Sequence, residues 1–331
     1  MKAAVYYNNS DVRTEEVDKP EIEEGEILVK IMASGICGSD VMEWYRIKKA
    51  PLVLGHEISG VVEESKNENF KPGDRVMSTH HVPCYKCKYC ESGHETVCDS
   101  LRNTKFYPGG FAEFVRIPKI NVKHGTLKLP EEVSFEEGTF LEPLGCVVRG
   151  QRIAGISKGK KILILGSGIS GLLHIQLAKY LGAEKITATD ISDYRLKKAE
   201  KLGADEVYKA DELPSDLKAD RVIVCTGAMP AIEQAFKSVD RGGTILFFAP
   251  TKPDVKVGMP LWYLWKDCVT LTTTYAAARG DLLEAFNLIK NKKINIESMI
   301  THRLPLEEAQ KGFELVAEAD DSVKVIIEPD K

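Results

Sequence analysis

The pattern of apolar and polar residues changes near residue 150 of this 331-residue chain. The first part contains short apolar runs rich in β-branched residues, and turn-forming stretches such as Lys71-Pro72-Gly73-Asp74 separate them. Such a pattern is typical of a compact β domain. Predicted strands in this part cover residues 27–33, 57–63, 74–78 and 111–117.

From about residue 160, short apolar runs alternate with helical stretches, which predicts a parallel sheet with crossover helices. Gly182 and Gly203 follow two of these stretches and are expected to cap the helices. The predicted strands cover residues 161–165, 185–189, 221–225, 243–249 and 269–273, and the predicted helices cover residues 171–181, 193–202 and 229–239.

Near the C-terminus, one more helix and one more strand are expected. The helix has an apolar face formed by Leu306, Ala309, Phe313 and Val316, and the strand covers residues 322–328. The pattern does not assign this strand to either domain.

Composition and charge narrow the class of protein. The chain is 43% apolar and contains no apolar run long enough to cross a bilayer, so we expect a globular protein of two domains without a membrane partner. A net charge of −4 and a pI near 6.1 leave no basic excess for binding nucleic acid. Residues 1–9 lack the apolar core of an export signal, which favours the cytoplasm.

Four cysteines lie within fifteen residues in the spacing C-x2-C-x2-C-x7-C: Cys84, Cys87, Cys90 and Cys98. A set of four thiolates with no open position is typical of structural zinc. An iron–sulfur cluster is an alternative, because spaced cysteines also bind such clusters. Disulfides are disfavoured by the expected reducing compartment.

The segment Gly166-Ser167-Gly168-Ile169-Ser170-Gly171 directly follows an apolar strand and begins a helix, the context of a dinucleotide-binding turn. Gly166 permits the tight turn, and Gly168 lets the backbone approach a pyrophosphate. Gly171 allows the helix to pack closely on the sheet. We expect Gly166, Gly168, Ile169 and Gly171 to contact the cofactor.

Asp190 ends the second predicted strand, nineteen residues after Gly171. A carboxylate here can accept hydrogen bonds from the adenosine ribose and repel a 2′-phosphate, so NAD is favoured over NADP. Arg195 is close enough in sequence to screen this charge, which keeps NADP as the alternative.

Cys37 and His56 each lie beside a glycine and offer ligands suited to zinc, and Glu142 adds a carboxylate. Alone, a cysteine or a histidine is more often an ordinary core or surface residue. The full series of motifs, however, resembles the zinc-dependent medium-chain dehydrogenases/reductases, in the branch of the polyol (sorbitol-like) and threonine dehydrogenases. In chain order these motifs are Cys37-Gly38-Ser39-Asp40, Gly55-His56-Glu57, the four cysteines, Gly110-Phe111-Ala112-Glu113, Glu142-Pro143 and the glycine turn.

The resemblance implies an α/β fold with two domains. A GroES-like β domain with two zinc sites would cover residues 1–150, and residues 294–331 would return to it. A Rossmann domain would cover residues 151–293 and bind NAD.

It also implies the residues of the catalytic site. Cys37, His56 and Glu142 would hold a catalytic zinc ion, Glu57 would exchange in as a ligand, and Cys146 is the alternative to Glu142. These ligands would be catalytic together with Ser39, which would accept the substrate proton.

Further positions follow from the same resemblance. Asp40 would fix the tautomer of His56. Many relatives carry a histidine where this chain has Met42, so the proton path beyond Ser39 stays open. Later strand ends would contact the cofactor through Thr226, Ala249 and Thr274.

The implied reaction is hydride transfer between NAD and a secondary alcohol, such as a polyol, a sugar acid or an amino alcohol, with two zinc ions per chain. The partner would be a small alcohol or ketone, and the chain would form a homodimer or homotetramer. Three alternatives remain: an L-threonine 3-dehydrogenase-like activity, a zinc-free reductase of the same fold, and a non-catalytic NAD-binding protein with structural zinc.

Overall fold

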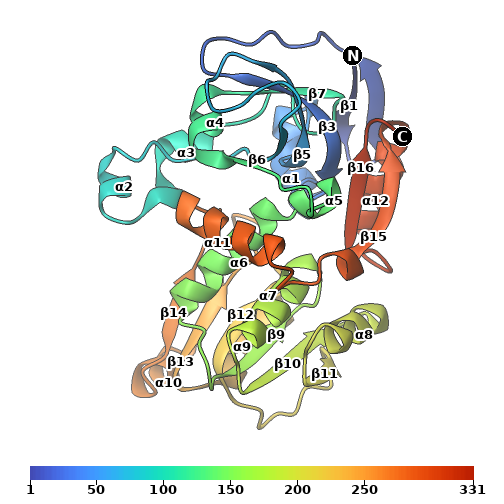
Figure 1. The fold of residues 1–331 in the computed structure, drawn as a ribbon. Coiled ribbons are helices and arrows are strands. Elements are labelled where there is room, and N and C mark those ends of the chain that lie inside the picture. The colour runs from blue at the N-terminus through green and yellow to red at the C-terminus, as the bar shows by residue number, and fades with distance from the viewer. The chain divides into compact units, whose positions relative to one another are not determined.

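The computed structural model describes all residues from Met1 to Lys331. The chain forms two compact units, one of Met1–Gly145 with Ala276–Lys331 and the other of Cys146–Tyr275 (Figure 1). The first unit therefore contains both ends of the chain. Its second segment begins at Ala276, eighteen residues before the return that the family resemblance implied, and it includes helix α11 (Arg279–Lys290).

A seven-stranded sheet forms the framework of the first unit. Its strands follow the order β15-β16-β3-β5-β6-β8, and β7 also pairs with β3. The last strand of the chain lies between β15 and β3, which assigns the C-terminal segment to this unit. The strands are β3 (Ile27–Gly35), β5 (Glu57–Ser65), β6 (Arg75–Thr79), β7 (Phe114–Ile117), β8 (Thr126–Lys128), β15 (Ile300–Pro305) and β16 (Lys324–Glu328).

A smaller sheet in the same unit has the order β2-β1-β4, with β1 (Lys2–Asn8), β2 (Asp11–Glu16) and β4 (Leu52–Val53). Its buried side chains share a core with the C-terminal helix α12 (Ala309–Glu318), where Tyr6, Phe111 and Phe313 pack together. The other α-helices of this unit are α1 (Glu43–Arg46), α2 (Lys88–Glu91), α3 (Asp99–Asn103), α4 (Lys119–Gly125) and α5 (Phe135–Gly138). Short 3-10 helices cover Ile47–Lys49, Glu95–Val97, Glu297–Met299 and Leu306–Glu308.

The second unit is built on a six-stranded parallel sheet of the order β11-β10-β9-β12-β13-β14. Its central strands carry continuous apolar runs because helices cover both faces of a parallel sheet. The strands are β9 (Lys161–Leu165), β10 (Lys185–Asp190), β11 (Glu206–Lys209), β12 (Ala219–Val224), β13 (Val239–Phe247) and β14 (Thr270–Thr273). The predicted parallel sheet is thus present, and β11 is a strand that the apolar pattern missed.

The helices of the second unit connect these strands. α7 (Ile169–Tyr180) packs on β9 and β10, α8 (Asp193–Lys201) on β10 and β11, and α9 (Met229–Ser238) on β12 and β13. α10 (Leu261–Lys266) precedes β14. As expected of helix C-caps, Gly182 and Gly203 have positive φ.

One helix, α6 (Leu141–Ala154), runs from the end of the first unit into the second. None of the helices is both long and apolar enough to pass through a bilayer.

Candidate metal centres and dinucleotide site

Strand register brings two of the predicted zinc ligands, Cys37 and His56, together with Glu57 to one end of the first unit's sheet. At the C-terminal end of β3, Gly35 pairs with Glu57, the first residue of β5. Glu57 in turn pairs with Thr79, the last residue of β6. Cys37 follows β3 and His56 precedes β5. The two residues therefore lie side by side although they are nineteen positions apart in sequence.

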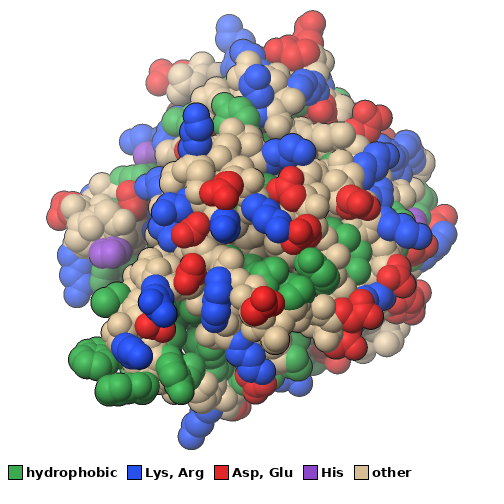
Figure 2. All heavy atoms as spheres, turned by 90° about the horizontal axis from the view of Figure 1, so that it is seen from below, with side chains coloured by type: hydrophobic (Ala, Val, Ile, Leu, Met, Phe, Trp, Pro, Cys, Tyr) green, Lys and Arg blue, Asp and Glu red, His purple; other side chains and the backbone are tan.

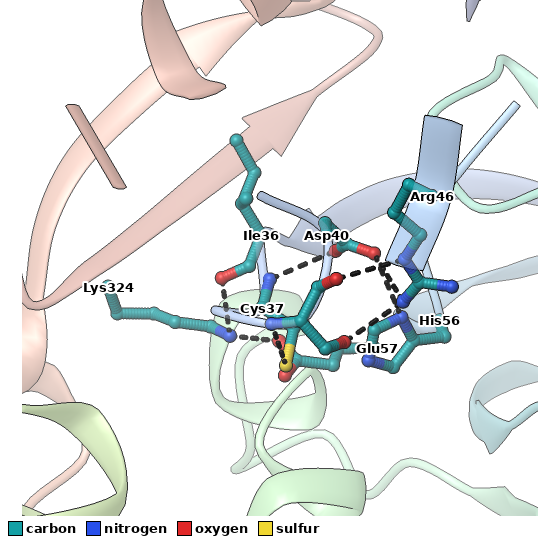
Figure 3. A network of polar contacts seen from close by, with 8 residues as sticks. Ile36, Cys37, Asp40, Arg46, His56, Glu57 and Lys324 are labelled. Carbon is teal, nitrogen blue, oxygen red and sulfur yellow. Dashed lines mark hydrogen bonds and ion pairs between the residues drawn. The ribbon is translucent and has the colours of Figure 1, made fainter. Parts of the chain in front are cut away.

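Cys37, His56 and Glu57 form the first candidate metal centre (Figure 3). Each offers one ligand atom, and these atoms lie within 4.8 Å of one another. His56 and Glu57 are buried. A thiol, an imidazole and a carboxylate make up a donor set that fits zinc.

Asp40 contacts two residues of this centre, Cys37 and His56. Its carboxylate is fully buried and accepts a hydrogen bond from the Cys37 amide at 3.1 Å. Its other oxygen lies 3.4 Å from Nδ1 of His56. Because Nδ1 faces Asp40, the ring presents Nε2 to a metal ion.

Asp40 and His56 each shift the pKa of the other toward its charged form. Burial alone raises the pKa of Asp40, but His56 and then Arg46 outweigh it and lower this pKa. Burial lowers the pKa of His56, whereas the Asp40 carboxylate raises it more strongly, to well above the ordinary value.

Arg46, in α1, fixes the candidate proton acceptor Ser39. Its guanidinium donates to the Ser39 carbonyl at 2.9 Å, to Ser39 Oγ at 3.0 Å and to Asp40 at 3.3 Å. Arg46 lies outside the motifs that the sequence singled out. Arg46 follows Ser39 by seven residues, and only the turn between them brings the two together.

Glu142 lies in the first turn of α6 and is not among the three residues whose ligand atoms cluster. The start of α6 is nevertheless close to the centre, since the ring of Phe140 lies 5.7 Å from Nζ of Lys324, which itself contacts Glu57. Cys146, the alternative ligand, follows Glu142 by one turn in the same helix.

Two histidines that the sequence pattern did not single out lie beside this centre. The rings of His56 and His80 are 4.7 Å apart, and those of His80 and His81 stack at 3.6 Å. Burial lowers the pKa of His81 to about 3, so its ring is neutral. Both residues directly follow β6, and a polar pair at a strand end was their only mark in the sequence.

The four cysteines form the second candidate centre. Cys84, Cys87, Cys90 and Cys98 have sulfur atoms within 4.8 Å of one another, and the pairs Cys84–Cys98 and Cys87–Cys90 are 3.6 Å apart. We call the segment that carries them, residues 84–98, the cysteine lobe.

The thiol groups of the cysteine lobe favour a cation. Burial raises the pKa of Cys98, but backbone amides of Cys84 and Leu101 outweigh it and bring this pKa to about 6. Burial and the neighbouring thiols raise the pKa of Cys90 to about 12. Four thiolates this close would repel one another. A divalent ion would neutralise their charge and so stabilise the deprotonated form of all four cysteines.

Tyr85 attaches the cysteine lobe to the rest of the first unit. Its hydroxyl accepts a hydrogen bond from the Arg279 amide at 2.8 Å, and its ring lies 4.8 Å from that of His124. The lobe thus contacts both α11 and the end of α4.

In the second unit, the glycine turn has the geometry of a dinucleotide-binding loop. It follows β9, the strand at which the order of the parallel sheet reverses, where such sheets bind ligands. Gly166 has a φ of 97°, and Gly168 is the N-cap of α7, so Ile169 begins the helix. A side chain on Gly171 would collide with the Gly166 carbonyl.

Asp190 is held beside this turn. Its oxygens accept hydrogen bonds from the amides of Ser167 at 2.7 Å and Ser192 at 2.9 Å. A guanidinium nitrogen of Arg195 lies 3.8 Å from where a Cβ on Gly168 would be.

Three further predicted cofactor contacts follow the carboxyl ends of other strands of the same parallel sheet. Thr226 follows β12, Ala249 follows β13 and Thr274 follows β14. Thr226 lies 3.4 Å from the position of a Cβ on Gly166. The Thr274 hydroxyl is buried without a hydrogen-bond partner, as expected of a group that a ligand completes.

Comparisons with known proteins agree with this arrangement. Residues 23–131 match the family described as alcohol dehydrogenase GroES-like domain, and residues 170–291 match zinc-binding dehydrogenase. The chain is 33% identical to a sorbitol dehydrogenase of Macaca fascicularis, over 94% of this chain and 91% of the relative. It is 32% identical to a probable D-xylulose reductase A of Aspergillus clavatus, over 96% and 93%.

Among solved structures, a zinc-binding dehydrogenase from Sinorhizobium meliloti 1021 bound to NADP superimposes with a TM-score of 0.88 at 26% identity, covering 99% of both chains. The chain belongs to the zinc-dependent medium-chain dehydrogenases, in the branch that contains the sorbitol dehydrogenases. It is an oxidoreductase with a GroES-like unit and a Rossmann unit, as the sequence motifs predicted.

Proposed function

We propose that this protein is a polyol dehydrogenase that transfers a hydride between a secondary alcohol group and NAD at a zinc ion. The observation that carries the proposal is the convergence of Cys37, His56 and Glu57, backed by the buried Asp40. A protein that only binds NAD needs no such group. The sorbitol dehydrogenase and D-xylulose reductase relatives support a polyol or its ketone as substrate.

The catalytic zinc would be held by Cys37, His56 and Glu142, with Glu57 as an exchanging ligand. When bound, zinc polarises the alcohol or carbonyl oxygen, and the nicotinamide accepts or donates the hydride. Ser39 receives the proton of the alcohol, and Arg46 holds the Ser39 hydroxyl in place. Asp40 keeps the ring of His56 oriented toward the metal.

NAD is the proposed cofactor rather than NADP. The carboxylate of Asp190 lies at the end of β10, held by two backbone amides, and it would repel a 2′-phosphate. The NADP in the Sinorhizobium relative makes a direct comparison of the two cofactors the appropriate test. A lower KM for NADP than for NAD would contradict the role of Asp190.

We further propose two zinc ions per chain, the second in the cysteine lobe, and a homodimer or homotetramer. All eight cysteines are free thiols, which suits the reducing cytoplasm. An exposed apolar group on α10 supports self-association. Figure 2 shows hydrophobic side chains gathered at one corner of the face viewed from below. The exposed apolar side chains of α10 are Leu261, Trp262, Tyr263 and Trp265.

The function is tested by adding NAD to the zinc-loaded protein and following nicotinamide absorbance with sorbitol, xylitol, other secondary alcohols and L-threonine. We expect turnover of at least one polyol and two zinc ions per chain by metal analysis. Cys37→Ser should abolish turnover, whereas Cys268→Ser, at an exposed cysteine, should not. Turnover of L-threonine alone would support the threonine dehydrogenase alternative, and full activity of Cys37→Ser would contradict the proposed site.

A further inference from the structure

A buried lysine contacts the catalytic centre and has no role in the function proposed above. Lys324 is the first residue of β16, and its side chain is fully buried. Its ammonium donates to the Ile36 carbonyl at 3.2 Å and forms an ion pair with Oε2 of Glu57 (Figure 3). Lysine is almost never fully buried unless it is paired, so this contact requires an explanation.

The sheet provides a space for this ion pair. β3 lies between β5 and β16, and its last residue, Gly35, pairs with Glu57 on one side and with Ile326 on the other. A Cβ on Gly35 would lie 2.6 Å from Cε and 2.8 Å from Nζ of Lys324, and it would collide with Oε2 of Glu57. The two side chains therefore meet across the one position of β3 that lacks a side chain.

In this geometry the Lys324 ammonium and a bound metal ion would compete for the Glu57 carboxylate. Glu57 lies within the cluster of metal-binding atoms, yet one of its oxygens is taken by the Lys324 ammonium. A buried carboxylate needs a positive partner, and without Lys324 the remaining candidate partner is the metal ion.

We propose that Lys324 is a positioning residue that keeps Glu57 from becoming a permanent metal ligand. The inference rests on the catalytic zinc site proposed above. By holding Oε2, Lys324 leaves Cys37, His56 and the third ligand as the permanent set and keeps one metal position accessible to substrate. Glu57 then exchanges in only when Lys324 releases it.

The test uses the Lys324→Met variant, with Lys324→Arg as the conservative variant and Lys30→Met as the control. Lys30, on β3, also makes an ion pair with the C-terminal segment, to Asp330 at 2.7 Å, but both side chains of this pair are exposed. Cobalt replaces zinc in each protein, and its visible absorption reports the coordination number. Difference spectra against wild type cancel the contribution of the cysteine lobe, and chelator competition measures metal affinity.

We expect Lys324→Met to show the weaker visible absorption of higher coordination and to bind metal about tenfold more tightly or better. Its kcat should fall more than its KM rises. Lys324→Arg and Lys30→Met should resemble wild type. Adding Glu57→Gln to Lys324→Met should restore the wild-type spectrum, because an amide is a poorer metal ligand than a carboxylate.

A role of Lys324 limited to anchoring β16 predicts the opposite pattern. Lys324→Met would then lose thermal stability while its cobalt spectrum and metal affinity stayed unchanged, and this result would overturn the inference. If Lys324→Met does not fold, Lys324→Gln, which keeps a donor without the charge, should shift the spectrum in the same direction. A wild-type protein that binds no metal outside the cysteine lobe would instead refute the proposed function itself.

Discussion

Two carboxylates, Glu57 and Glu142, are the candidates for the third ligand of the proposed zinc site. Glu57 lies within the ligand cluster but is engaged by a lysine, whereas Glu142 lies in the first turn of α6 and outside that cluster. If Lys324 has the role proposed above, Glu57 is the poorer permanent ligand, because the ammonium already occupies one of its oxygens. At the scale of single residues, the identity of the third zinc ligand therefore depends on which of these two carboxylates is free to bind.

We therefore expect Glu142→Ala to reduce kcat by about 100-fold or more, since the loss of a ligand weakens the metal on which the reaction depends. The melting temperature should change little, because the residue lies at a helix end. Steady-state kinetics with metal analysis provide the measurement, and Cys146→Ser is the matched control one turn along α6. If Cys146→Ser rather than Glu142→Ala loses activity, the third ligand is the thiol.

The cysteine lobe is the element whose stability depends most on a metal ion. Its two helical segments, α2 and the 3-10 helix Glu95–Val97, are single turns without a large core of their own, so four metal–sulfur bonds would replace apolar packing. Since four cysteines would fill all four positions, an ion bound here would have no open site for substrate. The lobe should therefore influence stability more than turnover.

Replacing Cys98 by Ser should lower the melting temperature by at least about 5 °C while the remaining soluble protein keeps its KM. Thermal unfolding followed by circular dichroism provides the measurement, and Cys268→Ser serves as the control at an exposed cysteine. An unchanged melting temperature together with a loss of hydride transfer would show that the lobe acts in catalysis.

At the scale of the whole molecule, the apolar side chains of α10 remain exposed. Trp262 and Trp265 are 64% and 69% exposed, and the next strand, β14, is an edge strand of the parallel sheet. Exposed apolar groups beside an open sheet edge are typical of a surface for a second chain. A second copy related by a twofold axis would cover the same residues on both chains.

We expect Trp262→Glu to shift the protein toward monomer, because a charge would be buried in the apolar contact. Light scattering coupled to size-exclusion chromatography measures this shift. Tyr180→Glu, at an aromatic residue of α7 that is 52% exposed, should leave the assembly unchanged. An unaltered mass for Trp262→Glu would place the subunit interface elsewhere.

Much of the fold was predictable because its features are local. The apolar runs identified most of the strands of the parallel sheet, and Gly182 and Gly203 marked helix ends through their positive φ. Short strands such as β4 and β11 were missed, because runs of two and four residues form no recognisable apolar pattern. The apolar pattern could not place the last strand, although the family resemblance did, because pairing of β16 with β3 depends on residues almost 300 positions apart.

The sequence by itself determined the family, the glycine turn and the grouping of the four cysteines, because each of these features lies within a short segment whose spacing reflects its geometry. Only the tertiary structure placed Lys324 on Glu57 and Arg46 on Ser39. The first of these contacts depends on the register of three strands around Gly35, and the second on the path of the chain after β3. Spacing along a sequence carries no information about partners that long-range strand pairing selects.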